Sequence, residues 1–144
     1  MSLLLSAPRQ TLSKNERLKS YKRIRLLFTE GQKMRVQSLL IYFQFQPHVP
    51  AAPALPHLQM GVTVGARYFK KAVDRNLIKR RIREAYRKNN NDIKCVLAEH
   101  KMSMDVFFVY THAEVLHYNQ LESSMQKALQ LLTDKINHIS ISKA

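Results

Sequence analysis

The 144-residue chain contains one cysteine, three glycines and no tryptophan. A lone Cys95 excludes an internal disulfide and fits a reducing compartment, and the apolar residues beside it predict a small core residue. The sequence contains no glycine-rich phosphate loop and no nucleophile elbow. The commonest sequence signatures of nucleotide-binding enzymes and serine hydrolases are therefore missing.

Acidic residues are also scarce, with 10 Asp and Glu scattered singly along the chain. A metal-dependent nuclease needs two or more clustered carboxylates to hold its metal ions. The six histidines show no metal-ligand spacing with cysteine or carboxylates. We therefore expect no catalytic residue and no metal site in the protein itself, which disfavours an autonomous nuclease.

Long hydrophobic runs are missing as well. The first ten residues, MSLLLSAPRQ, hold only three consecutive leucines and no positive charge before them. This run is too short for a signal peptide or a membrane span. We expect a cytoplasmic protein with no membrane partner.

Positive charge is what the chain has in excess. Its 24 Lys and Arg against 10 Asp and Glu give a formal net charge of +14 and a sequence pI near 10.2. Such an excess repels itself unless a polyanion neutralises it, so nucleic acid is the leading partner and an anionic membrane surface the second. A basic surface that serves only solubility remains the third interpretation.

The composition predicts one folded domain with flexible ends. At 45% hydrophobic residues the chain can bury a single core, which we assign to residues 15–139. Residues 1–14 read as a flexible basic arm and residues 140–144 as a tail. Four prolines at every third position of residues 47–57 predict an extended connection, although a proline-rich docking ligand remains an alternative.

Hydrophobic periodicity predicts three helices, at residues 21–29, 72–89 and 118–136, and three strands, at residues 38–46, 58–64 and 104–110. Ser20 should cap the first helix and Gly31 should end it. The order α-β-β-α-β-α, with room for one more short strand, fits a two-layer α+β sandwich whose helices cover one face of a small sheet.

Residues 72–89 separate into two faces at 100° per residue. Ile78, Ile82, Ala85 and Tyr86 form an arc that can be buried. A separate arc, called the basic stripe below, consists of Asn76, Lys79, Arg80, Arg83 and Arg87, with Arg75 near its border. Arg67, Lys70 and Lys71 stand just ahead of this helix.

The basic stripe is unusual because a helix that only needs a soluble face interleaves charges of both signs. Like charges on one stripe repel unless anions lie opposite, so the stripe predicts phosphate binding, with a solvated face as the alternative. An α-helix does not fit the deep, narrow major groove of A-form RNA, so such a helix is expected to contact backbone.

Two aromatic residues have basic or polar surroundings. Phe28 lies on the basic first helix, and Tyr42 lies on the less apolar face of strand 38–46. Aromatic faces near cations stack unpaired bases, although residues of these types at such positions more often belong to the core.

The segment from Lys70 to Arg83 resembles the signature of the protein subunit of bacterial ribonuclease P. That signature has a basic pair, an Ala-Val step and then Arg-Asn-x-x-Lys-Arg-x-x-Arg, which is matched here by Lys70-Lys71, Ala72-Val73, Arg75-Asn76, Lys79-Arg80 and Arg83. Arg17-Leu18, the helix ending in Phe28, Tyr42, the VFFVY strand and the final amphipathic helix extend the resemblance along the chain. Leu77 and Ile24 depart from it, since the family often has Arg and an aromatic residue there.

The resemblance implies a ribosomal-protein-like sandwich of α-β-β-(β)-α-β-α order, with a left-handed β-α-β crossover that contains the signature helix. It also implies that the catalytic RNA performs a magnesium-dependent cleavage of precursor tRNA, that Mg²⁺ is held mainly by this RNA, and that the protein is an accessory subunit. The implied RNA-binding residues are Arg67, Lys70, Lys71, Arg75, Asn76, Lys79, Arg80, Arg83 and Arg87. The implied cleft for the 5′ leader contains Arg17, Ile24, Phe28 and Tyr42. A structural protein that binds ribosomal RNA or DNA is the alternative.

Overall fold

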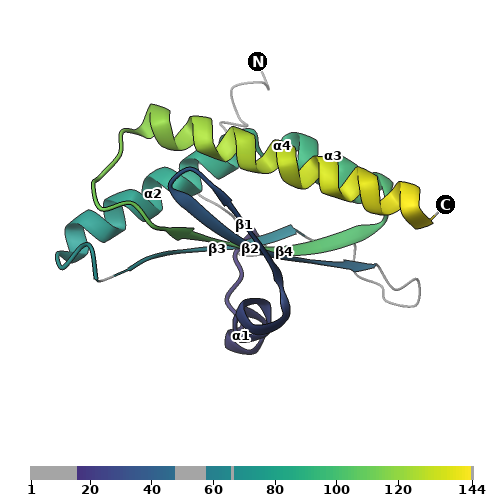
Figure 1. The fold of residues 1–144 in the computed structure, drawn as a ribbon, viewed down its shortest axis with the longest axis horizontal. Coiled ribbons are helices and arrows are strands. Elements are labelled where there is room, and N and C mark those ends of the chain that lie inside the picture. Colours follow the sequence, from purple (N-terminus) through teal and green to yellow (C-terminus); the bar gives the residue numbers. More distant parts are fainter. Residues whose placement is uncertain (1–15, 48–57, 66, 144) are drawn as a thin grey trace, which may run out of the picture.

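The computed structural model describes residues 16–47, 58–65 and 67–143. A four-stranded sheet in the order β1-β2-β4-β3 carries three helices on one face and α1 on the other (Figure 1). The expectation that helices cover one face is therefore correct for α2 and α4, whereas α1 lies on the other face. The predicted arm at residues 1–14 and most of the proline-rich connection lie outside the described residues.

The elements in chain order are α1 (Tyr21–Glu30), β1 (Gln32–Val36), β2 (Leu39–Pro47), β3 (Leu58–Val64), α2 (Ala72–Asn89), α3 (Asn91–Glu99), β4 (Met102–Tyr110) and α4 (Tyr118–Lys143). β3 and α2 have the predicted bounds. β1 is the additional short strand for which the predicted order left room, and α3 was not predicted. The last helix does not end near residue 136 but continues through Lys143, across most of the predicted tail.

Both ends of α1 follow from local chemistry. The Ser20 side chain accepts a hydrogen bond from the backbone N–H of Arg23 at 3.3 Å, as expected for an N-cap. The N–H of Gly31 donates to the carbonyl of Leu27 at 2.9 Å. A Cβ atom on Gly31 would lie 2.4 Å from that carbonyl oxygen. Any other residue would clash with the last turn of the helix, so the position requires glycine.

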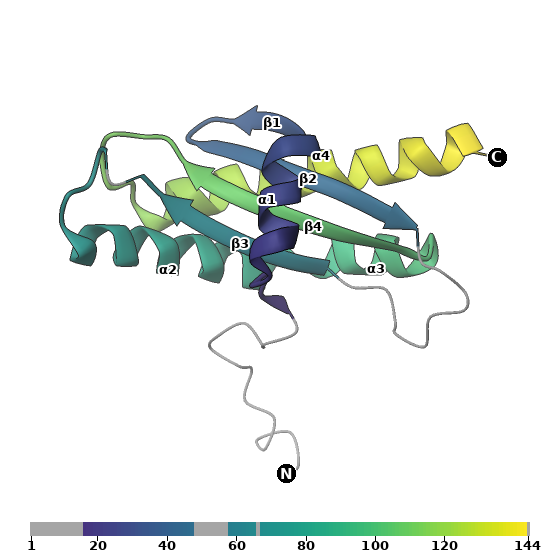
Figure 2. The same cartoon turned by 90° about the horizontal axis from the view of Figure 1, so that it is seen from below.

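The sheet combines antiparallel and parallel pairs. β2 pairs with β1 and with β4 in antiparallel register, whereas β3 pairs with β4 in parallel, from Leu58 opposite Met104 to Val64 opposite Tyr110. The connection from β3 to β4 runs through α2 and α3 on the helical face and is left-handed (Figure 2). Nearly all β-α-β crossovers are right-handed, so this rare feature confirms the crossover that the resemblance implied.

The main core lies between the sheet and its three helices. Ile78, Ile82, Ala85 and Tyr86 of α2 are fully buried, as the helical wheel predicted. Cys95 was expected in this core, but it is exposed on α3. Because α3 buries Ile93 and Leu97, a residue two positions after Ile93 faces about 200° away from the core.

Candidate nucleic-acid interface

The α2 helix is fixed against the molecule by its buried arc, and this fixes the direction of the basic stripe. α2 packs beside α4 and over β3, the edge strand of the sheet (Figure 2). Asn76, Arg80 and Arg83 are exposed, and Lys79 and Arg87 are half-buried. The stripe therefore forms a cationic surface along one edge of the protein.

Arg75 at the border of the stripe and Arg87 within it already have partners in the protein. Arg75 donates from Nη1 to the carbonyl oxygens of Phe69, at 2.6 Å, and Lys70, at 3.1 Å. Arg87 pairs with Glu84 through Nη2–Oε1 at 2.6 Å and Nε–Oε2 at 3.1 Å. The hydrogen bonds of this pair lower the pKa of Glu84 and raise the pKa of Arg87. Some of the N–H donors of Arg75 and Arg87 are thus used in hydrogen bonds within the protein and are not available to a ligand.

The segment before α2 presents three further cations. Arg67, Lys70 and Lys71 are all exposed. Between them, the buried Phe69 packs against Tyr110 of β4 with ring centroids 6.0 Å apart. Together with the hydrogen bonds of Arg75, this contact holds the cations of the segment next to the start of α2.

Arg17 brings the beginning of the described chain to the same edge. It forms a parallel bridge with Met60 of β3, and the N–H of Leu18 donates to the Met60 carbonyl at 2.8 Å. Although Arg83 on α2 is exposed, partial desolvation of its guanidinium and the nearby positive charge of Arg17 lower its pKa. The chain entering α1 and the basic stripe therefore meet at the β3 edge.

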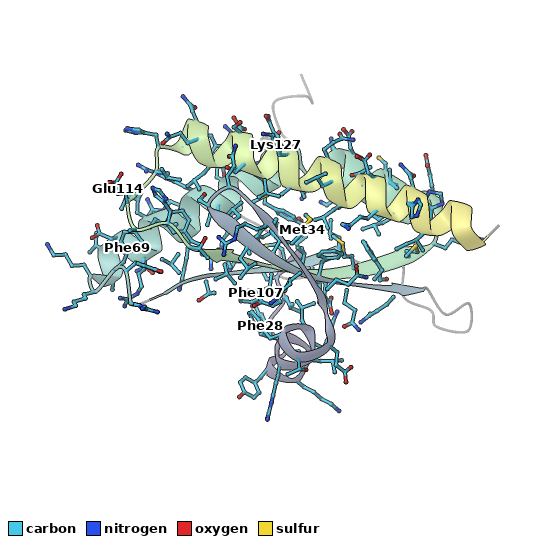
Figure 3. The ribbon with its side chains drawn as sticks, in the orientation of Figure 1. Phe28, Met34, Phe69, Phe107, Glu114 and Lys127 are labelled. Carbon is cyan, nitrogen blue, oxygen red and sulfur yellow. The ribbon has the colours of Figure 1, made fainter. Side chains whose placement is uncertain are left out.

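An aromatic cluster, Phe28, Tyr42 and Phe107, lies between α1 and the sheet. The ring centroid of Phe28 is 4.5 Å from that of Tyr42 and 5.1 Å from that of Phe107, both in edge-on contact. Figure 3 shows Phe28 of α1 next to Phe107 of the sheet. Ile24 packs against the same small core, which also buries Leu27. Phe28 keeps 36% of its surface exposed, so the cluster has an open rim.

Three of the four residues expected in the leader cleft are thus brought together by the fold. Ile24 and Tyr42 pack on the small core under α1, and Phe28 contacts the rings of Tyr42 and Phe107 there. Arg17 lies before α1, at the edge formed by β3. The two residues that depart from the family pattern have different surroundings. Ile24 packs against the small core under α1, and Leu77 is half-buried on α2.

The sequence reasoning missed the ion pair that fastens α1 to the sheet. Arg23 donates from Nε to Oδ2 of Asp105 at 3.2 Å, and its Nη2 contacts Oδ1 of the same carboxylate. Its Nη1 donates to Oε1 of Gln59 at 2.7 Å. Asp105 is only 2% exposed. The single carboxylate in the otherwise apolar strand MDVFFVY could have predicted an ion pair, because a buried charge needs a charged partner.

The described residues contain neither a metal-binding cluster nor a helix suited to a membrane. No three His, Cys, Asp or Glu side chains in that part of the chain gather closely enough to hold a metal ion. No helix within residues 16–47, 58–65 and 67–143 is long and apolar enough to cross a membrane.

The fold and the site together define a class of protein: a basic α+β sandwich that presents a cationic helix of a left-handed crossover at one sheet edge. The model of the family described as Ribonuclease P matches residues 12–133. The chain belongs to the ribonuclease P protein family, which confirms the resemblance seen in the sequence.

Individual proteins agree with this assignment. The ribonuclease P protein component of Porphyromonas gingivalis is 34% identical over 118 residues, which are 82% of this chain and 83% of that protein. The corresponding protein of Picosynechococcus sp. is 37% identical over 76 residues, or 53% of this chain and 60% of its own length. The structure of the Staphylococcus aureus RNase P protein superposes with a TM-score of 0.62 at 20% identity, covering 83% of this chain and 96% of that one. The Thermotoga maritima RNase P protein gives 0.58 at 21% identity, over 79% and 94% of the two chains.

Proposed function

We propose that this protein binds the catalytic RNA of ribonuclease P through the basic stripe and receives the 5′ leader of precursor tRNA on the aromatic cluster. The observation that carries the proposal is the arrangement around β3. The cationic helix lies on one face of the sheet, the aromatic cluster on the other, and the Arg17 segment joins them along the edge. One RNA assembly could contact both faces.

The two surfaces suit different parts of RNA. Arginine and lysine side chains neutralise backbone phosphates without reading sequence, as a folded RNA requires. Phe28, with its exposed edge beside Tyr42, offers a ring on which an unpaired base can stack. A single-stranded leader has such bases, whereas a duplex does not.

In this proposal the cleavage chemistry belongs to the RNA. Hydrolysis of a phosphodiester at metal ions needs a cage of ligands, and the carboxylates of the described residues form no such cluster. The described residues therefore do not fit a protein-held Mg²⁺, and the metal would be held mainly by the RNA. The protein would increase the affinity of the RNA for substrate and for the metal, and it would act in the cytoplasm.

Reconstitution tests this function directly. The purified chain alone should not cleave precursor tRNA, but mixed with its cognate RNA it should restore leader removal at low magnesium. The control variant Lys127→Gln removes a cation from the exposed face of α4, away from both surfaces, and should behave as wild type (Figure 3). Cleavage by the protein without RNA, or no effect of the protein on the RNA-catalysed reaction, would contradict the proposal.

The leader assignment needs a second comparison. Phe28→Ala should weaken binding of precursor tRNA to the reconstituted particle by roughly 10-fold, from loss of one stacking contact of about 1–3 kcal/mol. Binding of a leaderless tRNA should not change. Equal losses for both substrates would mean that Phe28 supports the fold of α1 and does not contact the leader.

A further inference from the structure

Two arginines from distant parts of the sequence converge at the β3 edge. Arg17 is held there by its bridge to Met60. Arg83 projects from α2, which packs over the same strand. The two guanidinium groups are close enough for Arg17 to contribute to the lowered pKa of Arg83, after partial burial as the larger cause.

Neither arginine has a partner in the described part of the chain. The Nε of Arg17 is buried and has no hydrogen-bond acceptor among these residues. The acid next to it, Glu16, pairs instead with Lys94 at 3.3 Å. One turn before and after Arg83 on α2 lie Lys79 and Arg87, so the helix offers no carboxylate there.

This arrangement is unfavourable in the isolated protein. A buried donor without an acceptor loses its hydration and gains nothing in return. Two guanidinium groups held near each other also repel. Both costs disappear when an anion with several acceptor oxygens lies between them, and a phosphate can accept forked hydrogen bonds from two arginines at once.

We propose that Arg17 and Arg83 together bind one phosphodiester group of RNA, at the junction between the basic stripe and the surface under α1. The inference rests on the proposed RNA-binding function and adds that these two residues form a single site. The phosphodiester would belong either to the catalytic RNA, which the stripe is proposed to contact, or to the 5′ leader, which would pass under α1.

A double-mutant cycle in the reconstituted particle tests the shared site. Arg17→Gln and Arg83→Gln should each weaken the same RNA interaction by about 10-fold, as expected for lost hydrogen bonds to a charged group. The double variant should bind no more than about 3-fold more weakly than either single variant, because one phosphate is lost in each case. The slope of log affinity against log salt should fall by roughly 0.7–0.9 in the double variant, the value for one phosphate.

Three binding measurements identify the source of the phosphate. If it belongs to the leader, the variants lose affinity for leader-bearing precursor tRNA, while binding of leaderless tRNA and assembly with the catalytic RNA are unchanged. If it belongs to the catalytic RNA, the loss appears in assembly. Arg17→Lys and Arg83→Lys retain the charge without the fork, so they should show partial losses even where a glutamine variant folds poorly, and thermal unfolding verifies each fold.

Two results would overturn the shared site. Multiplicative losses, with a slope change of roughly 1.4–1.8 in the double variant, would mean two separate phosphates. Unchanged affinity for every RNA would mean no phosphate at all. The wild-type protein and Lys127→Gln are measured in parallel, so a failure of both to bind RNA would instead refute the proposed function on which the inference rests.

Discussion

At the scale of single residues, Gly61 determines how closely the aromatic cluster can approach β3. Gly61 lies directly opposite Phe107 in the parallel pair of β3 and β4. A Cβ atom at this position would come within 2.3 Å of Cε2 and 2.5 Å of Cδ2 of the Phe107 ring. The Phe107 ring, which Phe28 contacts, therefore occupies the space that a side chain at position 61 would need.

We predict that Gly61→Ala displaces the Phe107 ring and lowers the free energy of unfolding by roughly 1–3 kcal/mol, the usual cost of overpacking. Urea unfolding measures the loss, and the affinity for leader-bearing precursor tRNA should fall with it. Gly65→Ala is the matched control, since the nearest atom to its added Cβ is 4.0 Å away. Equal stability of the two variants would show that Phe107 moves aside without cost.

Residue patterns predicted the buried arc of α2 well but not the partners of its arginines. Ile78 and Ile82 could be assigned to the core because burial follows from periodicity alone. The hydrogen bonds of Arg75 to the carbonyls of Phe69 and Lys70 depend on where the loop before the helix lies, which the helical wheel does not contain. The partner of Asp105 came from an element 82 residues away in the sequence.

At the scale of elements, the ion pair between Arg23 and Asp105 fastens α1, which buries only Leu27 fully. We predict that Arg23→Met or Asp105→Leu alone lowers the free energy of unfolding by about 3 kcal/mol, because each removes one charge of an ion pair whose carboxylate is buried against the sheet. The lower end of the usual range applies because the Arg23 side chain remains 33% exposed.

Combining the two substitutions distinguishes the effect of losing the ion pair from the effect of changed side-chain packing. The double variant should recover most of the lost stability, since apolar side chains of similar size often replace a buried ion pair at no net cost. Urea titrations of the four proteins give the coupling energy. Losses that simply add would show that the pair contributes no coupling and that each residue acts through its other contacts.

The basic stripe predicts an electrostatic interface along the whole of α2. Lys79→Ala combined with Arg83→Ala should weaken association with the catalytic RNA and reduce its salt slope by roughly one to two, one unit for each lost phosphate contact. Filter binding across a potassium chloride series measures the slope. An unchanged slope would place the RNA on another surface, and Lys127→Ala supplies the control from α4.

Among the elements, the first and last residues of α2 and β3 could be predicted from the sequence, because both have strong hydrophobic periodicity and clear ends. β1 could not, since QKMRV has only Met34 and Val36 on its apolar side and depends on pairing with β2. α3 was missed for a similar reason, as only Ile93 and Leu97 mark its buried face. Short elements of this kind form through tertiary contacts more than through their own propensities.

At the scale of the whole molecule, the net charge of +14 should set how stability responds to salt. Self-repulsion weakens the folded state, and salt screens it. We predict that the melting temperature rises between 0.05 and 0.5 M potassium chloride, by roughly 3–5 °C for each ~1 kcal/mol of repulsion relieved. Thermal unfolding by circular dichroism measures the shift.

A decrease of the melting temperature with increasing salt would be equally informative. A melting temperature that falls with salt would mean that ion pairs such as Lys94 with Glu16 and Arg87 with Glu84 outweigh the repulsion. A short RNA should raise the melting temperature more than an equal concentration of phosphate charge added as free phosphate ion, because only the polyanion spans several cations at once.

The position of β4 has a consequence for how the chain folds as it is synthesised. β4 is the last strand in sequence, yet it lies between β2 and β3 and pairs with both. Until residue 110 has left the ribosome, β1 and β2 can form a hairpin. β3 still lacks β4, its partner strand, and Arg23 of α1 still lacks Asp105, its ion-pair partner. We therefore expect the nascent chain to complete its sheet, anchor its first helix and form its RNA-facing edge in one late, cooperative step.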